Sequence, residues 1–274
     1  MTKKGKLQVV VSISIATIKG GIRDRLYQGI GLLGFFLIFS TAIFSSFSMR
    51  QPVEVSINYC LSVVQIISIV VTLFLGLNLI SSEIDSKANH LILVQPISRT
   101  AYIAGKFIGF VALTGITIFL LSIFASLGTL LTCVGTKHPP NISWCNFAIS
   151  IIGSFEACVV LGAVTILFTS FATSSILPFL MTCVVYAIGQ STQSVLRYIN
   201  SGMAKTQLAP SLKFIVKAAY YVFPNFALFD FKAQAIYALK IPAKLFALSI
   251  VYGLSYVLVS IFLAIIIFEK RDLP

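Results

Sequence analysis

Six long apolar segments separated by short polar stretches make up most of this chain. A helix needs roughly 20 mostly apolar residues to cross the hydrocarbon core of a bilayer. The segments that meet this requirement are 27–47, 59–80, 107–134, 147–170, 176–196 and 245–268. They lack the regular alternation of apolar and polar positions that marks the strands of an outer-membrane barrel. The pattern therefore predicts an all-α membrane protein with six transmembrane helices.

The composition of the chain supports this prediction. Of the 274 residues, 58% are hydrophobic and 10% are charged, and the mean hydropathy is +0.98. These values lie well outside the range of soluble globular proteins. No internal repeat or low-complexity tract divides the sequence, so we expect a single transmembrane domain that covers residues 1–274.

The segment before the first apolar run has two faces when it is drawn as a helix. Its polar positions are Lys4, Gln8, Ser12, Lys19 and Arg23, and its apolar positions are Leu7, Val10, Val11, Ile15 and Ile18. This pattern predicts an N-terminal amphipathic elbow helix that lies in the membrane interface. The β-branched run VVVSISI also fits a strand, and a short frayed lead-in is a further alternative.

The net charge of +12 is spread over the connecting loops. A nucleic-acid-binding protein would gather its basic residues on one folded surface, so this distribution argues against nucleic acid as a partner. With six spans, the basic residues before the first span, between the second and third, and after the last share one side. The positive-inside rule makes that side the cytoplasm, where we expect both termini. Seven basic residues at 197–244 fall on the other side, but the rule weakens in long loops.

The loop at 197–244 is interpreted as neither a soluble domain nor a further span. Its aromatic residues alternate with lysines, which predicts segments that rest at the level of the lipid headgroups. Pro210, Pro224 and Pro242 divide the loop into short pieces. The aromatic residues concerned are Phe214, Tyr220, Tyr221, Phe223, Phe226, Phe229, Phe231 and Tyr237.

The sequence contains no motif for ATP hydrolysis or for another catalysed reaction. It lacks the G-x-x-x-x-G-K-[ST] phosphate-binding loop, and His90 and His138 fall in loops on opposite sides of the membrane, where no catalytic set can form. The five cysteines occur singly, without the spacing of a metal site. Cys133 and Cys145 bracket one loop and could form a disulfide in an oxidising compartment. We expect no enzymatic activity, metal or cofactor in this chain.

Glu156 is the charged residue that falls inside a predicted span. An acid inside the membrane is costly unless it is paired or protonated, which makes it a candidate functional residue. It either forms hydrogen bonds within the bundle or at a dimer interface, or it lines a substrate path.

A polar island interrupts the apolar pattern from Ser81 to Lys106. A helical drawing has Glu83, Ser86, Lys87 and His90 on one face, Ile84, Ala88, Leu91 and Ile92 on another, and Pro96 after them. A solvated loop with positive-inside charges would explain the basic residues, but it would not explain the apolar run LILV beside them. The pattern predicts a cytoplasmic helix between the second and third spans whose apolar face binds a partner.

The island also carries a family resemblance. Glu83, the run LILVQPISR from Leu91 to Arg99, Tyr102, Gly105 and Lys106 resemble the cytoplasmic coupling segment of the ABC type 2 permease family. The family pattern has a Gly-Thr pair where this sequence has Lys87 and Ala88. The segments YYVFPNFALFD and FEKRDLP are similar to the closing part of the same family.

The resemblance implies the permease subunit of an ABC exporter in a bacterial plasma (inner) membrane. Such a permease dimerises within the membrane lipids and docks separate ABC ATPase subunits, which bind the ATP and Mg. The residues that it implies in ATPase coupling are Glu83, Lys87, His90, Leu91, Ile92, Pro96 and Arg99. A second copy of the permease fits Gly29, Gly31 and Gly34 of the first span, because small residues allow close helix packing.

Two other classes of membrane protein stay open at this point. A secondary transporter would show paired broken helices and several polar groups inside the membrane, which is more than the single acid found here. A membrane assembly protein without transport activity would need no coupling segment.

Overall fold

The computed structural model describes residues 3–23, 25–48, 50–85, 98–136, 142–172, 174, 176–200 and 217–270. Within these ranges the regular structure is helical, without strands, and the predicted all-α fold is confirmed. The elements are α1 (Lys3–Arg23), α2 (Arg25–Ser46), α3 (Pro52–Asp85), α5 (Arg99–Gly135), α6 (Trp144–Phe171), α7 (Ile176–Asn200), the 3-10 helix η1 (Phe226–Phe229), α9 (Lys232–Ile236) and α10 (Ala243–Lys270). A further helical turn covers 217–222.

Six helices in the described part of the chain are long and apolar enough to cross a membrane. Their apolar segments are Gly29–Ser46, Pro52–Gly76, Arg99–Gly135, Trp144–Phe171, Ile176–Tyr198 and Ala243–Lys270. Each overlaps one of the six predicted spans. The longest helix, α5, has 37 residues and is therefore about 55 Å long, which exceeds the roughly 30 Å of a hydrocarbon core.

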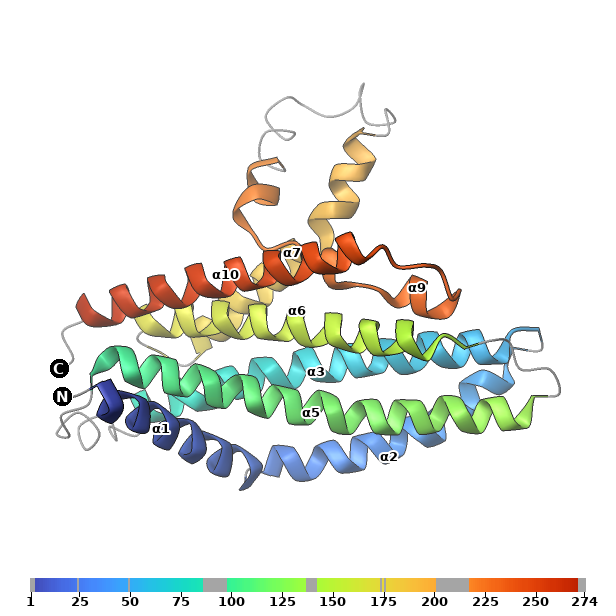
Figure 1. Cartoon of the computed structure of the whole chain (residues 1–274), viewed down its shortest axis with the longest axis horizontal. Coiled ribbons are helices and arrows are strands. Elements are labelled where there is room, and N and C mark those ends of the chain that lie inside the picture. The colour runs from blue at the N-terminus through green and yellow to red at the C-terminus, as the bar shows by residue number, and fades with distance from the viewer. Residues whose placement is uncertain are drawn as a thin grey trace.

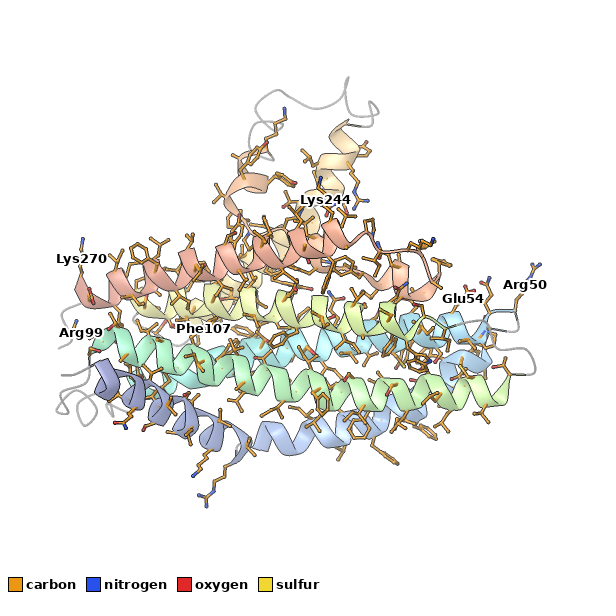
Figure 2. The ribbon with its side chains drawn as sticks, viewed as in Figure 1. Arg50, Glu54, Arg99, Phe107, Lys244 and Lys270 are labelled. Carbon is orange, nitrogen blue, oxygen red and sulfur yellow. The ribbon has the colours of Figure 1, made fainter. Side chains whose placement is uncertain are left out.

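Most of the long helices form one bundle around α5, whereas α7 packs against α3 and α6 and its last part projects from the bundle (Figure 1). α5 packs against α1, α2, α3, α6 and α10. α1 begins and α10 ends at the same end of the bundle, which we call the terminal end (Figure 1). Arg99 and Lys270 lie at the terminal end, whereas Arg50 and Glu54 lie at the opposite end, which we call the far end (Figure 2).

The N-terminal segment is a helix, so the strand alternative is wrong. α1 packs closely along the first part of α5, where two glycines leave room for it. A Cβ at Gly105 would lie 2.9 Å from the Cβ of Ile13, and one at Gly109 would lie 2.6 Å from the Cβ of Thr17. Val11 and Ile15 are exposed, so part of the apolar face of α1 is directed away from the bundle.

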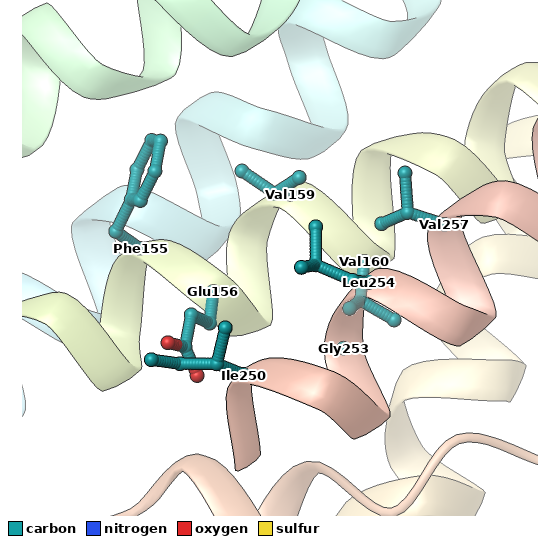
Figure 3. Close-up of a pocket in the computed structure, with 8 residues that line it drawn as sticks. All are labelled: Phe155, Glu156, Val159, Val160, Ile250, Gly253, Leu254 and Val257. Atoms are coloured by element: carbon teal, nitrogen blue, oxygen red, sulfur yellow. The ribbon is translucent and has the colours of Figure 1, made fainter. Parts of the chain in front are cut away.

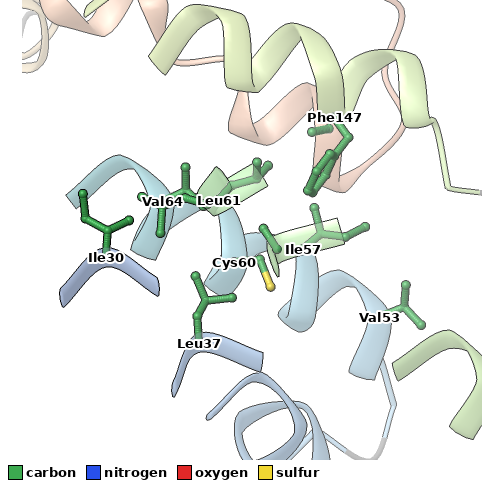
Figure 4. Close-up of a cluster of buried hydrophobic side chains, with 11 residues drawn as sticks. Ile30, Leu37, Val53, Ile57, Cys60, Leu61, Val64 and Phe147 are labelled. Carbon is green, nitrogen blue, oxygen red and sulfur yellow. The ribbon is translucent and has the colours of Figure 1, made fainter. Parts of the chain in front are cut away.

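A buried cluster joins α2, α3, α5, α6 and α9 (Figure 4). Its members are Ile30, Leu37, Val53, Ile57, Cys60, Leu61, Val64, Leu121, Ala125, Phe147 and Ala235. The Thr41 hydroxyl donates to the Leu37 carbonyl at 2.6 Å and lies 3.3 Å from the Cys60 sulfur. The Thr41–Cys60 contact therefore links α2 to α3 beside the cluster.

Large apolar side chains cover the outside of the bundle. Among the exposed ones are Leu32, Phe35, Phe36 and Phe39 of α2 and Leu254, Leu258 and Phe262 of α10. A soluble monomer rarely exposes continuous apolar surface of this extent. The surface therefore fits a bundle that is surrounded by lipid or by other protein chains.

The segment at 223–231 differs from the expected headgroup-level loop, because its aromatic residues lie inside the bundle. Phe226 and Phe229 are only 1% and 2% exposed. A Cβ at Gly189 of α7 would lie 2.2 Å from the carbonyl oxygen of Pro224, and one at Gly153 of α6 would lie 2.3 Å from that of Phe229. The two glycines give the segment room to enter, and the burial of its rings outweighs the interfacial preference that the sequence indicated.

Candidate functional site

The helices on either side of the predicted coupling segment meet the terminal end of the bundle. α3 ends at Asp85 and α5 begins at Arg99, beside Lys270 of α10 (Figure 2). Glu83 belongs to the last turn of α3, although only its backbone is described. The other predicted coupling residues, Lys87, His90, Leu91, Ile92 and Pro96, lie outside the described residues.

Arg99 binds the end of α10 through its guanidinium group. Its Nη1 donates to the carbonyl oxygens of Phe268 at 3.0 Å and Glu269 at 3.1 Å. The last carbonyls of a helix lack partners within the helix and carry the negative end of its dipole, so a cation is favourable there. Arg99 was expected to face an ATPase, and in the structure it also ties the first residue of α5 to the last turn of α10.

Two further residues of the family-like pattern extend this contact. The rings of Tyr102 and Phe268 are stacked, with centroids 6.1 Å apart and an angle of 14° between their planes. The Lys106 Nζ lies 5.7 Å from the centroid of the Tyr102 ring, and Lys106 is only 8% exposed. We call Arg99, Tyr102, Lys106 and Phe268 the clamp. Arg99 and Tyr102 contact the last turn of α10, and Lys106 lies over the Tyr102 ring.

Glu156 lies on α6 beside a groove between α6 and α10 (Figure 3). The groove has a volume of about 120 Å³ and is lined by Phe155, Glu156, Val159, Val160, Ile250, Gly253, Leu254 and Val257. The Ser249 side chain is within hydrogen-bonding reach of the Glu156 carboxylate. The Oε2 atom of Glu156 is buried and has no hydrogen-bond partner. The structure therefore places this acid at an apolar groove with half of its carboxylate unsatisfied.

The second half of α7 is polar, although the sequence predicts an ordinary span there. Its apolar window has a mean hydropathy of 1.2, against 1.9 to 2.6 for the other five segments in the described ranges. The side-chain carbonyl oxygens of Gln190 and Gln193 are buried without hydrogen-bond partners. The run GQSTQS from Gly189 to Ser194 was the available signal. These amides mark α7 as a second candidate for polar chemistry within the membrane.

The cysteines form no centre in the described part of the chain. All five are free thiols, including Cys133 and Cys145. Cys60 and Cys158 are buried among apolar side chains, as expected of small core residues. No group of three or more metal-binding side chains occurs among the described residues.

Comparison with known proteins identifies a family for nearly the whole chain. A protein-family model described as "ABC-2 family transporter protein" matches residues 10–273. A search of the curated proteins finds no match. The family match includes the predicted coupling segment, the clamp, the groove and the polar half of α7.

Proposed function

Because the chain belongs to the ABC-2 family of transporter proteins, we propose that it is the permease subunit of an ABC exporter. In this proposal a separate ABC ATPase subunit binds and hydrolyses ATP with Mg²⁺. The observation that carries the proposal is where α3 ends, at Asp85, and where α5 begins, at Arg99. Both helices cross the bundle and reach its terminal end at these residues. An ATPase bound there would act directly on two membrane-spanning helices.

The charges support a cytoplasmic position for the terminal end. Arg99 and Lys106 of α5 and Lys270 of α10 belong to the helix segments that begin or finish at this end. Basic residues next to spans are retained on the cytoplasmic side, which is also the side that contains ATP. The protein is a multi-pass membrane protein, and we assign it to the bacterial plasma (inner) membrane with both termini in the cytoplasm.

The clamp gives the ATPase a way to move more than one helix. Arg99 is the first residue of α5 and binds the last turn of α10. A displacement of the coupling segment therefore reaches α5 and α10 together. Since α10 forms one wall of the Glu156 groove, this movement changes the groove as well.

Two copies of the chain would enclose the substrate path in this proposal. A single bundle of six helices offers one wall, and the amides of Gln190 and Gln193 supply polar groups that are costly against lipid. Gly29 and Gly31 of α2 have open space beside them, as a close-packed partner helix requires. Gly34 faces Phe124 of the same chain instead, so it is removed from the proposed homodimer contact.

The test is recovery of the ATPase with the permease. Permease that carries Leu91→Ser and Ile92→Ser together is expressed in its native host and purified, and the ABC ATPase recovered with it is compared with the amount recovered with wild type. Loss of apolar interface anchors commonly costs about 1 to 4 kcal/mol, so we expect ATPase recovery to fall about tenfold or more. The matched control carries Phe47→Ser and Val134→Ser, two exposed apolar residues of the far-end region, and should retain the ATPase.

The outcomes separate the classes of function. Equal recovery with both double variants would contradict the docking assignment. Failure of the wild-type permease to retain any ABC ATPase would favour a secondary transporter or a membrane assembly protein.

A further inference from the structure

The groove between α6 and α10 combines apolar walls with one carboxylate. Its volume is about 120 Å³, similar to engineered apolar cavities of about 150 Å³ that bind benzene. Leu254 on its rim is exposed, so the groove is reached from the outside of this bundle. Phe155 adds an aromatic ring to the wall. The space fits one ring or one short substituted arm of a larger molecule.

The carboxylate of Glu156 has one hydroxyl donor close to it among the described residues. The Ser249 hydroxyl on α10 is within hydrogen-bonding reach of it and also lies 2.8 Å from the Phe246 carbonyl oxygen, so two acceptors compete for it. A hydroxyl has one proton to give. The Oε2 atom has no hydrogen-bond partner at all. One shared hydroxyl does not neutralise an ionised carboxylate, and none of the described residues that line the groove carries a positive charge.

The depth of Glu156 makes a neutralising partner more important. The residue lies about 18 Å along α6 from Trp144, in a helix of 28 residues that is about 42 Å long. It is therefore close to the middle of the span, where an unpaired charge is least favourable. Water and salt are scarce at this depth, and a ligand that reaches it must itself be soluble in the membrane.

We propose that the groove binds an amphipathic organic cation, with its ammonium group on Glu156 and a ring or alkyl arm against Phe155 and Leu254. The ion pair satisfies the carboxylate, the aromatic wall is favourable for a neighbouring cation, and the rest of the molecule stays in lipid. This inference rests on the proposed function as a permease, because it identifies the class of molecule that the exporter takes from the membrane.

Gly253 explains why the groove exists at the contact of the two helices. A Cβ at this position would lie 3.3 Å from the Phe229 ring and 3.6 Å from a methyl group of Val160. The glycine thus lets α10 approach the buried 223–231 segment and leaves no side chain in the space before Glu156. Leu254, the next residue, reaches the rim, where a larger side chain would close the entrance.

The test measures binding to the full-length permease in lipid nanodiscs, without any ATPase. The probe is radiolabelled benzyldimethyldodecylammonium, and empty nanodiscs give the partition background. Dodecyl benzyl ether, which has the same ring and chain without the charge, is the neutral comparison. The variants are Glu156→Gln, Leu254→Trp and the control Glu54→Gln, which removes a carboxylate at the far end.

We expect saturable binding of the cation to the wild-type permease and to Glu54→Gln. Glu156→Gln should weaken it by about thirtyfold or more, as expected for loss of one partner of a buried charge pair, and Leu254→Trp should weaken it without a change of charge. The ether should bind wild type and Glu156→Gln alike. Size-exclusion profiles of all variants establish that each is folded.

Three results would overturn the proposal. The first is saturable cation binding that Glu156→Gln leaves unchanged, and the second is absence of saturable binding to the wild type. The third is binding to separated chains that is lost in dimeric nanodiscs, which would assign the groove to a contact between two copies. Failure here leaves ATPase co-purification unaffected, whereas a wild-type permease that binds the cation but retains no ABC ATPase would contradict only the proposed exporter function.

Discussion

The clamp and the Glu156 groove both bring α10 against another long helix, but they treat charge in opposite ways. At the clamp, Arg99 donates to two carbonyls and Lys106 lies over the Tyr102 ring. At the groove, one oxygen of Glu156 is buried without a partner. A charge with partners holds two helices in a fixed relation, whereas an unsatisfied charge costs stability in the absence of a ligand. This difference is what the proposed roles require, with transmission at the first region and binding at the second.

The largest expected change in stability follows removal of the Arg99 charge at the clamp. Arg99→Leu should lower the free energy of unfolding by about 2 kcal/mol, because it removes two charge-assisted hydrogen bonds and leaves the last α10 carbonyls uncapped. The measurement is unfolding of the purified permease in mixed micelles. Arg50→Leu, at an exposed position near the far end, is the control and should have little effect. Equal losses of stability in the two variants would mean that the clamp does not stabilise the fold.

Substitution by leucine at the groove should stabilise the protein, whereas at the clamp it should destabilise it. Glu156→Leu should raise the free energy of unfolding by about 1 to 2 kcal/mol, since a buried unpaired acceptor costs about that much and leucine suits the apolar walls. The same unfolding assay compares it with Glu54→Leu. A clear loss of stability in Glu156→Leu would mean that the carboxylate is already satisfied within the protein, and the contrast with the clamp would fail.

The smallest expected change in stability is at Tyr102 of the clamp. Tyr102→Leu should lower the free energy of unfolding by about 1 kcal/mol, because it removes a ring stack with Phe268 and a contact with Lys106. Tyr102→Phe keeps a ring and should retain most of that stability. Identical losses in both variants, observed in the same assay, would show that the phenol hydroxyl rather than the ring matters at this contact.

The sequence could predict the spans and the intramembrane acid because both depend on local composition. Twenty apolar residues in a row specify a membrane helix wherever it packs, and Glu156 is conspicuous in such a run. The partner of Arg99 was not predictable, because it lies 169 residues away along the chain. The carbonyls that it binds belong to the backbone, so no side chain at 268 or 269 signals the contact.

The burial of 223–231 was missed for a related reason. Alternating aromatic and basic residues suit the headgroup region. No residue of the loop indicates that Gly153 and Gly189 leave room for it. Those glycines lie in other helices, where each reads as an ordinary small residue of a span. Only the packed bundle shows that they face the carbonyls of Phe229 and Pro224.

The same segment imposes an order on the assembly of the protein during synthesis. The backbone N–H of Asn225 donates to the Tyr252 hydroxyl at 2.8 Å, and the Phe229 ring packs beside Gly253. Both of these contacts come from α10, which follows the segment in the sequence. In a nascent chain that has not yet formed α10, the Asn225 contact with Tyr252 and the Gly253 side of the Phe229 ring are both unmade. The packing of this segment therefore depends on a helix that is synthesised after it.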